Sequence, residues 1–210
     1  MRLKTWRGAR IGLLGGSFNP AHDGHRHISL EALARLDLDA VWWLVSPGNP
    51  LKPLDGMAPL DDRLAFANTV AHHRKIQVTD IEWDLGTVYT ADTLAALTAR
   101  YPGVRFVWLM GADNLSQIDR WARWLQIFHT VRIAVFDRPG YSLRALAGKA
   151  ARRFADARIA ENRARALADF GPPAWVYLHV RRHSASSTRL RAGGRSPFGI
   201  HTLKDKGGPP

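Results

Sequence analysis

Short apolar runs alternate along this chain with longer segments of helical periodicity, and this alternation restricts the fold more than any other feature. Four of the runs are Arg10–Gly15, Ala40–Val45, Val104–Met110 and Val131–Phe136. They are too short for buried helices and rich in residues that favour β-strands. Such alternation predicts βαβ units, and therefore a Rossmann-like α/β fold in which helices cover both faces of a parallel sheet.

The remaining elements are predicted from the same patterns. Two further strands are expected at Lys75–Thr79 and Trp175–Val180. Proline and glycine make Ser46–Pro59 a loop. Helical spacing predicts helices over Asp23 to about Leu36, Leu60–His73, Thr90–Arg100 and Trp121–Phe128, and a mostly helical Leu143–Phe170.

Polar clusters follow the predicted strands at the point where each strand ends. They are GGSFNPAHDGH after the first strand, SPGNPLK after the second, GADN after the fourth, DRPGY after the fifth and SASSTRLR after the last. Ligands of parallel α/β sheets bind beyond the carboxyl ends of the strands. The sequence therefore predicts one site, built from five loops on one edge of the sheet.

Length and composition favour one domain in a reducing compartment. A chain of 210 residues fits a single domain, expected over residues 10–191 with a leader at 1–9 and a tail at 192–210. There are no cysteines, which excludes disulfides and thiolate metal sites. No apolar stretch approaches the ~20 residues of a membrane span. We expect a cytoplasmic protein without a membrane partner.

The net charge of +12 is concentrated near the C-terminus. Residues 141–210 hold 14 Lys and Arg against 4 Asp and Glu. Such a region could meet nucleic acid, an anionic membrane surface or a small polyanion such as ATP, or it could be a solvated helix face. No nucleic-acid recognition motif is present, and acids are interspersed among the arginines of Arg144–Arg165. These observations argue against nucleic acid and leave a small polyanion or a solvated helix face open.

The loop Gly15–His25 has the composition of a phosphate site. It lacks both the Walker ending and Gly-x-Gly-x-x-Gly, which argues against P-loop and hydride-transfer chemistry. A zinc site on its histidines is disfavoured, because they point in different directions from a starting helix and have no Cys or His-Glu-x-x-His partner. We instead expect His22 and His25 to donate hydrogen bonds to phosphate at a helix N-terminus, where the dipole already attracts anions. His27 is more easily explained as structural.

Two motifs carry a resemblance to a known superfamily. GGSFNPAHDGH resembles the (T/S)-F-(D/N)-P-x-H-x-G-H signature of nucleotidylyltransferases, and Ser186-Ser187-Thr188 with Arg191 resembles their second signature, S-S-T-x-x-R. Within the superfamily, GNPLK, YTADTL, MGADNL, Trp121 and RPGY are similar to the nicotinate-nucleotide adenylyltransferases. The resemblance spans roughly Ile11–Arg191.

The resemblance implies transfer of AMP from ATP to nicotinic acid mononucleotide, with release of pyrophosphate and formation of deamido-NAD in NAD biosynthesis. The attacking group is a phosphate monoester, already ionised at neutral pH because its second pKa is about 6. No general base or covalent nucleophile is then required. The protein holds two anions together and spreads the charge that builds up on the phosphates. Mg²⁺, bound mainly through ATP phosphates, would need few protein ligands.

The resemblance also implies the site residues. The catalytic set is His22, His25, Lys52 and Arg191. The ATP-binding set is Gly15, Gly16, Ser17, Phe18, His22, His25, Gly111, Asp113, Ser187, Thr188 and Arg191. The acceptor-binding set is Asn49, Lys52, Thr90, Asp113, Trp121 and Arg138, with Trp121 stacking on the pyridine ring and Thr90 near its carboxylate. No protein metal ligands are implied.

Several alternatives stay open at this stage. Trp121 could be a core residue, Thr90 could cap the helix that it begins, and Lys52 could be a solvated loop lysine. Asn19 stands where aspartate is frequent, and Asn49-Pro-Leu-Lys52 lacks a histidine that many relatives place before the basic residue. A related enzyme acting on phosphopantetheine or nicotinamide mononucleotide is the nearest rival, and a basic nucleic-acid-binding module is a remote one.

Overall fold

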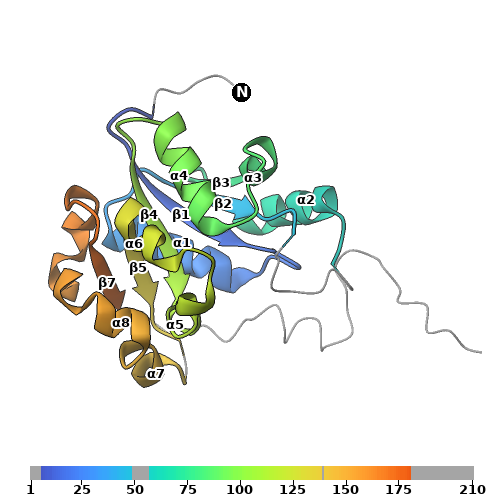
Figure 1. The fold of residues 1–210 in the computed structure, drawn as a ribbon. Coiled ribbons are helices and arrows are strands. Elements are labelled where there is room, and N and C mark those ends of the chain that lie inside the picture. The colour runs from blue at the N-terminus through green and yellow to red at the C-terminus, as the bar shows by residue number, and fades with distance from the viewer. Residues whose placement is uncertain (1–5, 49–56, 139, 181–210) are drawn as a thin grey trace, which may run out of the picture.

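A seven-stranded parallel sheet forms the centre of the protein (Figure 1). The computed structural model describes residues 6–48, 57–138 and 140–180. The strand order is β3-β2-β1-β4-β5-β7-β6, and every neighbouring pair is parallel. The strands are β1 (Arg10–Gly16), β2 (Ala40–Val45), β3 (Ile76–Thr79), β4 (Arg105–Gly111), β5 (Arg132–Phe136), β6 (Arg158–Ile159) and β7 (Trp175–Leu178). The predicted fold class is confirmed.

Two separate apolar clusters line the two faces of the sheet, because successive side chains of a strand point to opposite faces. In β2, Trp42 belongs to one cluster and Trp43 to the other. Helices α3 (Ile81–Asp84), α4 (Thr90–Arg100), α5 (Ala112–Leu115), α6 (Trp124–Thr130), α7 (Ser142–Leu146) and α8 (Lys149–Arg153) contribute to the first cluster. Helices α1 (Asp23–Arg35) and α2 (Leu60–Ala71) and the 3₁₀ segment η3 (Glu161–Asp169) contribute to the second.

Most predicted elements occur within one or two residues of their expected ends. The strand Ala40–Val45 and the helix Thr90–Arg100 have the predicted bounds. Trp42, Trp43 and Trp108 are buried in the core, as expected. In the described ranges no helix has the length and apolar character that crossing a membrane would require.

The prediction of a mostly helical Leu143–Phe170 is wrong. The segment is divided into α7, α8, the 3₁₀ turn η2 (Ala155–Ala157), strand β6 and η3. Gly148 precedes α8 with extended backbone angles and so separates it from α7. Arg158 and Ile159 then pair with Trp175 and Val176. Tertiary pairing with a sheet edge therefore overrides local helix propensity.

The helix predicted at Trp121–Phe128 begins later than expected. A 3₁₀ turn, η1 (Ile118–Arg120), comes first, and Trp121 follows it with extended backbone angles of φ −78° and ψ 144°. Helix α6 starts only at Trp124. Trp121 therefore lies in a connection between two elements, where its ring can face a cavity.

Candidate active site

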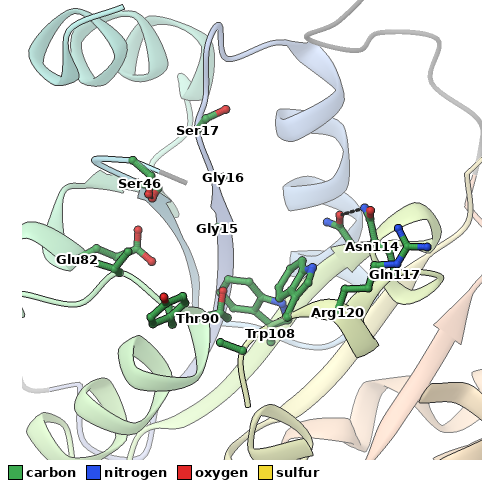
Figure 2. Close-up of a pocket in the computed structure, with 15 residues that line it drawn as sticks. Gly15, Gly16, Ser17, Ser46, Glu82, Thr90, Trp108, Asn114, Gln117 and Arg120 are labelled. Carbon is green, nitrogen blue, oxygen red and sulfur yellow. Dashed lines mark hydrogen bonds between the residues drawn. The ribbon is translucent and has the colours of Figure 1, made fainter. Parts of the chain in front are cut away.

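A cavity of about 470 Å³ opens at the carboxyl ends of β1, β2 and β4 (Figure 2). Figure 2 shows Ser46 and Glu82 on one side of Gly15 and Gly16, and Asn114, Gln117 and Arg120 on the other. The lining residues are Gly15, Gly16, Ser17, Ser46, Gly48, Glu82, Val88, Tyr89, Thr90, Trp108, Asn114, Gln117, Arg120, Trp121 and Ala122. The cavity lies at the sheet edge where the polar clusters were expected to meet.

The indole of Trp108 explains why β1 carries glycine at position 15. A Cβ atom on Gly15 would overlap Cη2 of Trp108 and lie 3.2 and 3.3 Å from Cζ2 and Cζ3. Trp108 is itself 3% exposed and lines the cavity. Gly15 thus leaves room for a rigid aromatic wall, which is a packing role.

The loop after β1 is fixed by the buried side chain of Phe18. Its ring stacks on Trp43 at a centroid distance of 5.1 Å and lies 4.6 Å from the ring of His25. Phe18 has a positive φ of 46°, an uncommon angle for a bulky residue. Packing on Trp43 offsets this backbone strain. Because the Phe18 side chain is only 1% exposed, it supports His25, and any contact with ATP would come from its backbone.

His22 and His25 lie together at the N-terminus of α1. His22 is the residue that precedes the helix, and the two imidazole rings stack with centroids 3.8 Å apart. Nδ1 of His25 accepts a hydrogen bond from the backbone N–H of His22 (3.2 Å). Helix α1 directs its positive dipole end toward the same place.

The His25 ring is neutral near pH 7 and carries its proton on Nε2. Burial lowers the pKa of His25 well below its usual 6.5, and the charges of His22 and Arg138 lower it further. Since Nδ1 already accepts a hydrogen bond from the backbone, the neutral ring keeps its own proton on Nε2. His25 is therefore a fixed hydrogen-bond donor without a formal charge.

Asp113 and Arg138 form an ion pair next to this histidine pair. Nη1 of Arg138 donates to Oδ2 of Asp113 at 2.6 Å. Oδ1 of Asp113 is buried and has no hydrogen-bond partner among the described residues. A Cβ on Gly111 would overlap that oxygen, so glycine at 111 gives the carboxylate its space. One oxygen is thus held by Arg138, while the other is buried without a hydrogen-bond donor among the described residues.

Arg63 of α2 ties together the loops that follow β1 and β2, a role that the sequence analysis missed. It is 1% exposed. Its Nη1 donates to the carbonyl oxygens of Ser17 and Ser46, both at 2.7 Å, and its Nε donates to that of Ala58 at 2.9 Å. Burial lowers the pKa of this guanidinium. Backbone carbonyls hold the cation, which in turn holds two loops of the site in place.

Asn19 helps to hold the loop after β1 in place. Its Oδ1 accepts a hydrogen bond from the backbone N–H of Ala58 at 3.2 Å. The loop after β1 is therefore joined to the chain entering α2, beside the carbonyl groups that Arg63 holds.

The opposite end of the cavity is formed by the start of α4 and by Trp121. Tyr89 precedes the helix and Thr90 is its first residue, with no side-chain cap. The alternative that Thr90 caps this helix is therefore wrong. The Trp121 ring packs against the core from a partly buried position and lines the cavity. An uncapped helix N-terminus and an indole thus meet in one cavity.

Glu82 of α3 is the second residue that the sequence analysis missed. It is 7% exposed, yet it lines the cavity. Burial raises the pKa of this carboxyl group to about 7, although hydrogen bonds with the Thr93 and Ser46 side chains act in the opposite direction.

The structure brings most of the described candidate residues to one sheet edge. Gly15, Gly16, Ser17, Thr90 and Trp121 line the cavity. The remaining described candidates, which lie outside that lining, are Phe18, His22, His25, Gly111, Asp113 and Arg138. The candidates Asn49, Lys52, Ser187, Thr188 and Arg191 fall outside the described residues, so their roles stay predictions.

The ranges that the structure describes contain no candidate group of side chains for binding a metal ion. No cluster of three or more His, Asp or Glu side chains there could hold an ion. The histidines of the first motif instead face each other in a stacked pair.

Comparison with known proteins identifies a matching family and several similar proteins. The family described as cytidylyltransferase-like matches residues 13–193. A protein of Cereibacter sphaeroides named "Probable nicotinate-nucleotide adenylyltransferase" is 59% identical over 185 residues, covering 88% of this chain and 98% of the relative. Relatives of the same name from Methylorubrum extorquens and Roseobacter denitrificans are 54% and 51% identical, covering 87% and 91% of this chain and 98% and 96% of their own.

Solved structures support the fold. The Plasmodium falciparum nicotinic acid mononucleotide adenylyltransferase complexed with NaAD superposes with a TM-score of 0.66 at 15% identity, covering 88% of this chain and 83% of that one. The same enzyme complexed with APC gives a TM-score of 0.64. At this identity the likeness concerns the architecture of the sheet and its helices.

Proposed function

Because the chain belongs to the cytidylyltransferase-like family, we propose that it transfers AMP from ATP to nicotinic acid mononucleotide, giving deamido-NAD and pyrophosphate. One structural observation supports the proposal independently of the names of the chain's relatives. The described structure places a neutral, donor-ready His25 at a helix N-terminus and an indole-walled cavity at the same edge of the sheet. A triphosphate and a pyridine ring need those two environments side by side.

The phosphate half of the site would be formed around α1. The backbone N–H groups at the start of α1 and the neutral His25 would donate hydrogen bonds to anionic oxygens. Gly16 has no side chain, so phosphate oxygens can come close to its backbone. A neutral donor with its proton on Nε2 can stabilise charge that develops on the α-phosphate without competing for a proton. His22, stacked on His25, would share this contact.

The acceptor half would be formed by the cavity. Trp121 offers a face on which the pyridine ring stacks, and the uncapped start of α4 at Thr90 attracts the ring carboxylate. Asp113 would accept a hydrogen bond from a ribose hydroxyl, and Arg138 would lie near the acceptor phosphate. The attacking phosphate needs no base, since its second pKa is about 6.

Mg²⁺ belongs to the proposal as a partner of ATP. The described residues contain no carboxylate cluster that would dehydrate the ion, which suits an ion that keeps its waters and takes phosphate oxygens. Bound in this way, it would neutralise charge on the β- and γ-phosphates. Lys52, Ser187, Thr188 and Arg191 are proposed to contact the same phosphates, and Asn49 the acceptor.

Pyrophosphate release tests the proposed function. The purified chain is incubated with ATP, Mg²⁺ and one acceptor at a time: nicotinic acid mononucleotide, nicotinamide mononucleotide or phosphopantetheine. We expect fast release with the first and slower release with the second. Release with phosphopantetheine alone, or no release with any acceptor together with salt-sensitive binding of duplex DNA, would overturn the proposal. The cytoplasmic location is part of the proposal and is tested by cell fractionation.

A further inference from the structure

The cavity contains a buried carboxyl group that the proposed chemistry does not use. Glu82 is 7% exposed and borders the same cavity as Thr90 and Trp121. No ion pair involving Glu82 occurs among the described residues, whereas nine other ion pairs do. An acid that is buried, unpaired and open to a ligand cavity is costly to keep ionised. Such a group calls for an explanation in terms of the ligand.

Glu82 is held against the first turn of α4. The Thr93 hydroxyl donates to Oε1 of Glu82 at 3.2 Å, and the backbone N–H of Thr93 donates to the carbonyl of Tyr89 at 3.1 Å. The Thr87 hydroxyl lies 2.9 Å from that of Thr93. Because Tyr89 and Thr90 begin α4 and line the cavity, the Glu82 carboxyl group is fixed next to the helix end where the ring carboxylate would bind.

The charged surroundings of Glu82 are sparse. On its own segment, Asp80 and Asp84 lie two residues away on either side. On α4, Asp92 is paired with Arg123. The described part of the loop after β2 contributes Ser46 and no charge, and the far wall contributes Arg120. Burial is accordingly the dominant influence on the carboxyl group.

We propose that Glu82 is a specificity-determining residue: in its protonated form it donates a hydrogen bond to the carboxylate of the acceptor's pyridine ring and so favours the acid acceptor over the amide. This inference rests on the proposed function. Two carboxyl groups in contact cannot both stay ionised, so they share one proton. The ionised Glu82 repels the ring carboxylate but accepts a hydrogen bond from the corresponding amide. Preference for the acid acceptor therefore decreases as Glu82 loses its proton.

The test compares the two acceptors across pH. kcat/KM is measured for nicotinic acid mononucleotide and nicotinamide mononucleotide between pH 6.5 and 8.5, and their ratio is taken. Both acceptors carry the same phosphate, so its titration cancels. With a titration near pH 7, the ratio of acid to amide is expected to fall by at least about 25-fold over this range. In Glu82→Gln the ratio is expected to be independent of pH.

Two further measurements test whether the pH dependence comes from Glu82. Asp84→Asn removes a carboxylate from the exposed side of the same helix and should keep the wild-type pH profile. Calorimetry of wild-type protein at pH 8, in buffers with different ionisation enthalpies, should show proton uptake with the acid acceptor and none with the amide.

The possible outcomes separate the two proposals. If neither acceptor releases pyrophosphate, the proposed function fails and this inference fails with it. If both turn over but the ratio changes less than ~3-fold, or falls equally in Glu82→Gln, only the role of Glu82 is overturned. Loss of the preference for the acid acceptor in Arg120→Gln, with the wild-type preference kept in Glu82→Gln, would also overturn it, because Arg120 would then hold the ring carboxylate.

Discussion

The close approach of β1 to the Trp108 indole can be tested by replacing Gly15 with alanine. The new Cβ would overlap Cη2 of Trp108 and lie 3.2 and 3.3 Å from Cζ2 and Cζ3. These are atoms of a rigid ring that is 3% exposed, so the ring must tilt or β1 must shift. Overpacking of this kind costs about 1–3 kcal/mol. A tilted Trp108 also intrudes on the cavity, so KM for the acceptor should rise.

A double-mutant cycle isolates that contact. Trp108→Phe removes the tip of the ring that meets the new methyl group, at its own cost in packing. In the Trp108→Phe background, Gly15→Ala should cost less than about 0.5 kcal/mol, which gives a coupling energy of at least about 0.5 kcal/mol. Gly171→Ala is the matched control, because no atom lies within 4 Å of its Cβ position.

Urea unfolding of the four proteins, followed by circular dichroism, gives the free energies of unfolding at constant m-value. Additive costs of Gly15→Ala and Trp108→Phe would refute the packing argument. An unchanged stability of Gly15→Ala would refute it as well.

The remaining predictions concern His25, Arg63 and Glu82. His25→Ala should lower kcat by ~10²–10³ with little change in the acceptor KM, as for loss of a transition-state donor; unchanged kcat in steady-state assays would remove His25 from the chemistry. Arg63→Met should lower the free energy of unfolding by about 2–4 kcal/mol in urea titrations, because it leaves buried carbonyl groups without a donor; a loss below about 0.5 kcal/mol would contradict its bridging role. Burial raises the pKa of Glu82 to about 7, against 4.5 in the unfolded chain. Ionisation of Glu82 therefore lowers the free energy of unfolding increasingly between pH 4.5 and pH 7, and not below pH 4.5. Glu82→Gln should therefore be more stable than wild type by up to about 3 kcal/mol at pH 8 and similar to it at pH 4.5; thermal scans showing the reverse order would reject this sign.

Local patterns sufficed to predict six of the seven described strands and the residues of the first motif. The apolar run Ala40–Val45 and the helical spacing of Thr90–Arg100 each identify an element without reference to the rest of the chain. The motif around His22 and His25 predicted two side chains that the structure brings together at the start of α1, because its residues are close in sequence. The helix prediction for Leu143–Phe170 was wrong because Gly148 interrupts the helix formers and because β6 pairs with β7.

The missed residues depend on contacts between distant segments. Arg63 shares the buried face of α2 with Ala67 and Ala71. A cation on an otherwise apolar helix face was the sequence signal that could have identified it. Its carbonyl partners, however, come from loops that only the sheet brings together. Glu82 has an ordinary acidic neighbourhood in sequence, and its burial becomes evident only when α3 and α4 pack beside the loop after β2.

A crystal structure of the protein with bound deamido-NAD tests the central claim most directly. The account predicts the ligand's phosphates within hydrogen-bonding distance of Nε2 of His25, the pyridine ring stacked on Trp121, and the ring carboxylate between Thr90 and Glu82. Phosphates bound away from the start of α1, or a pyridine ring outside the cavity, would contradict it.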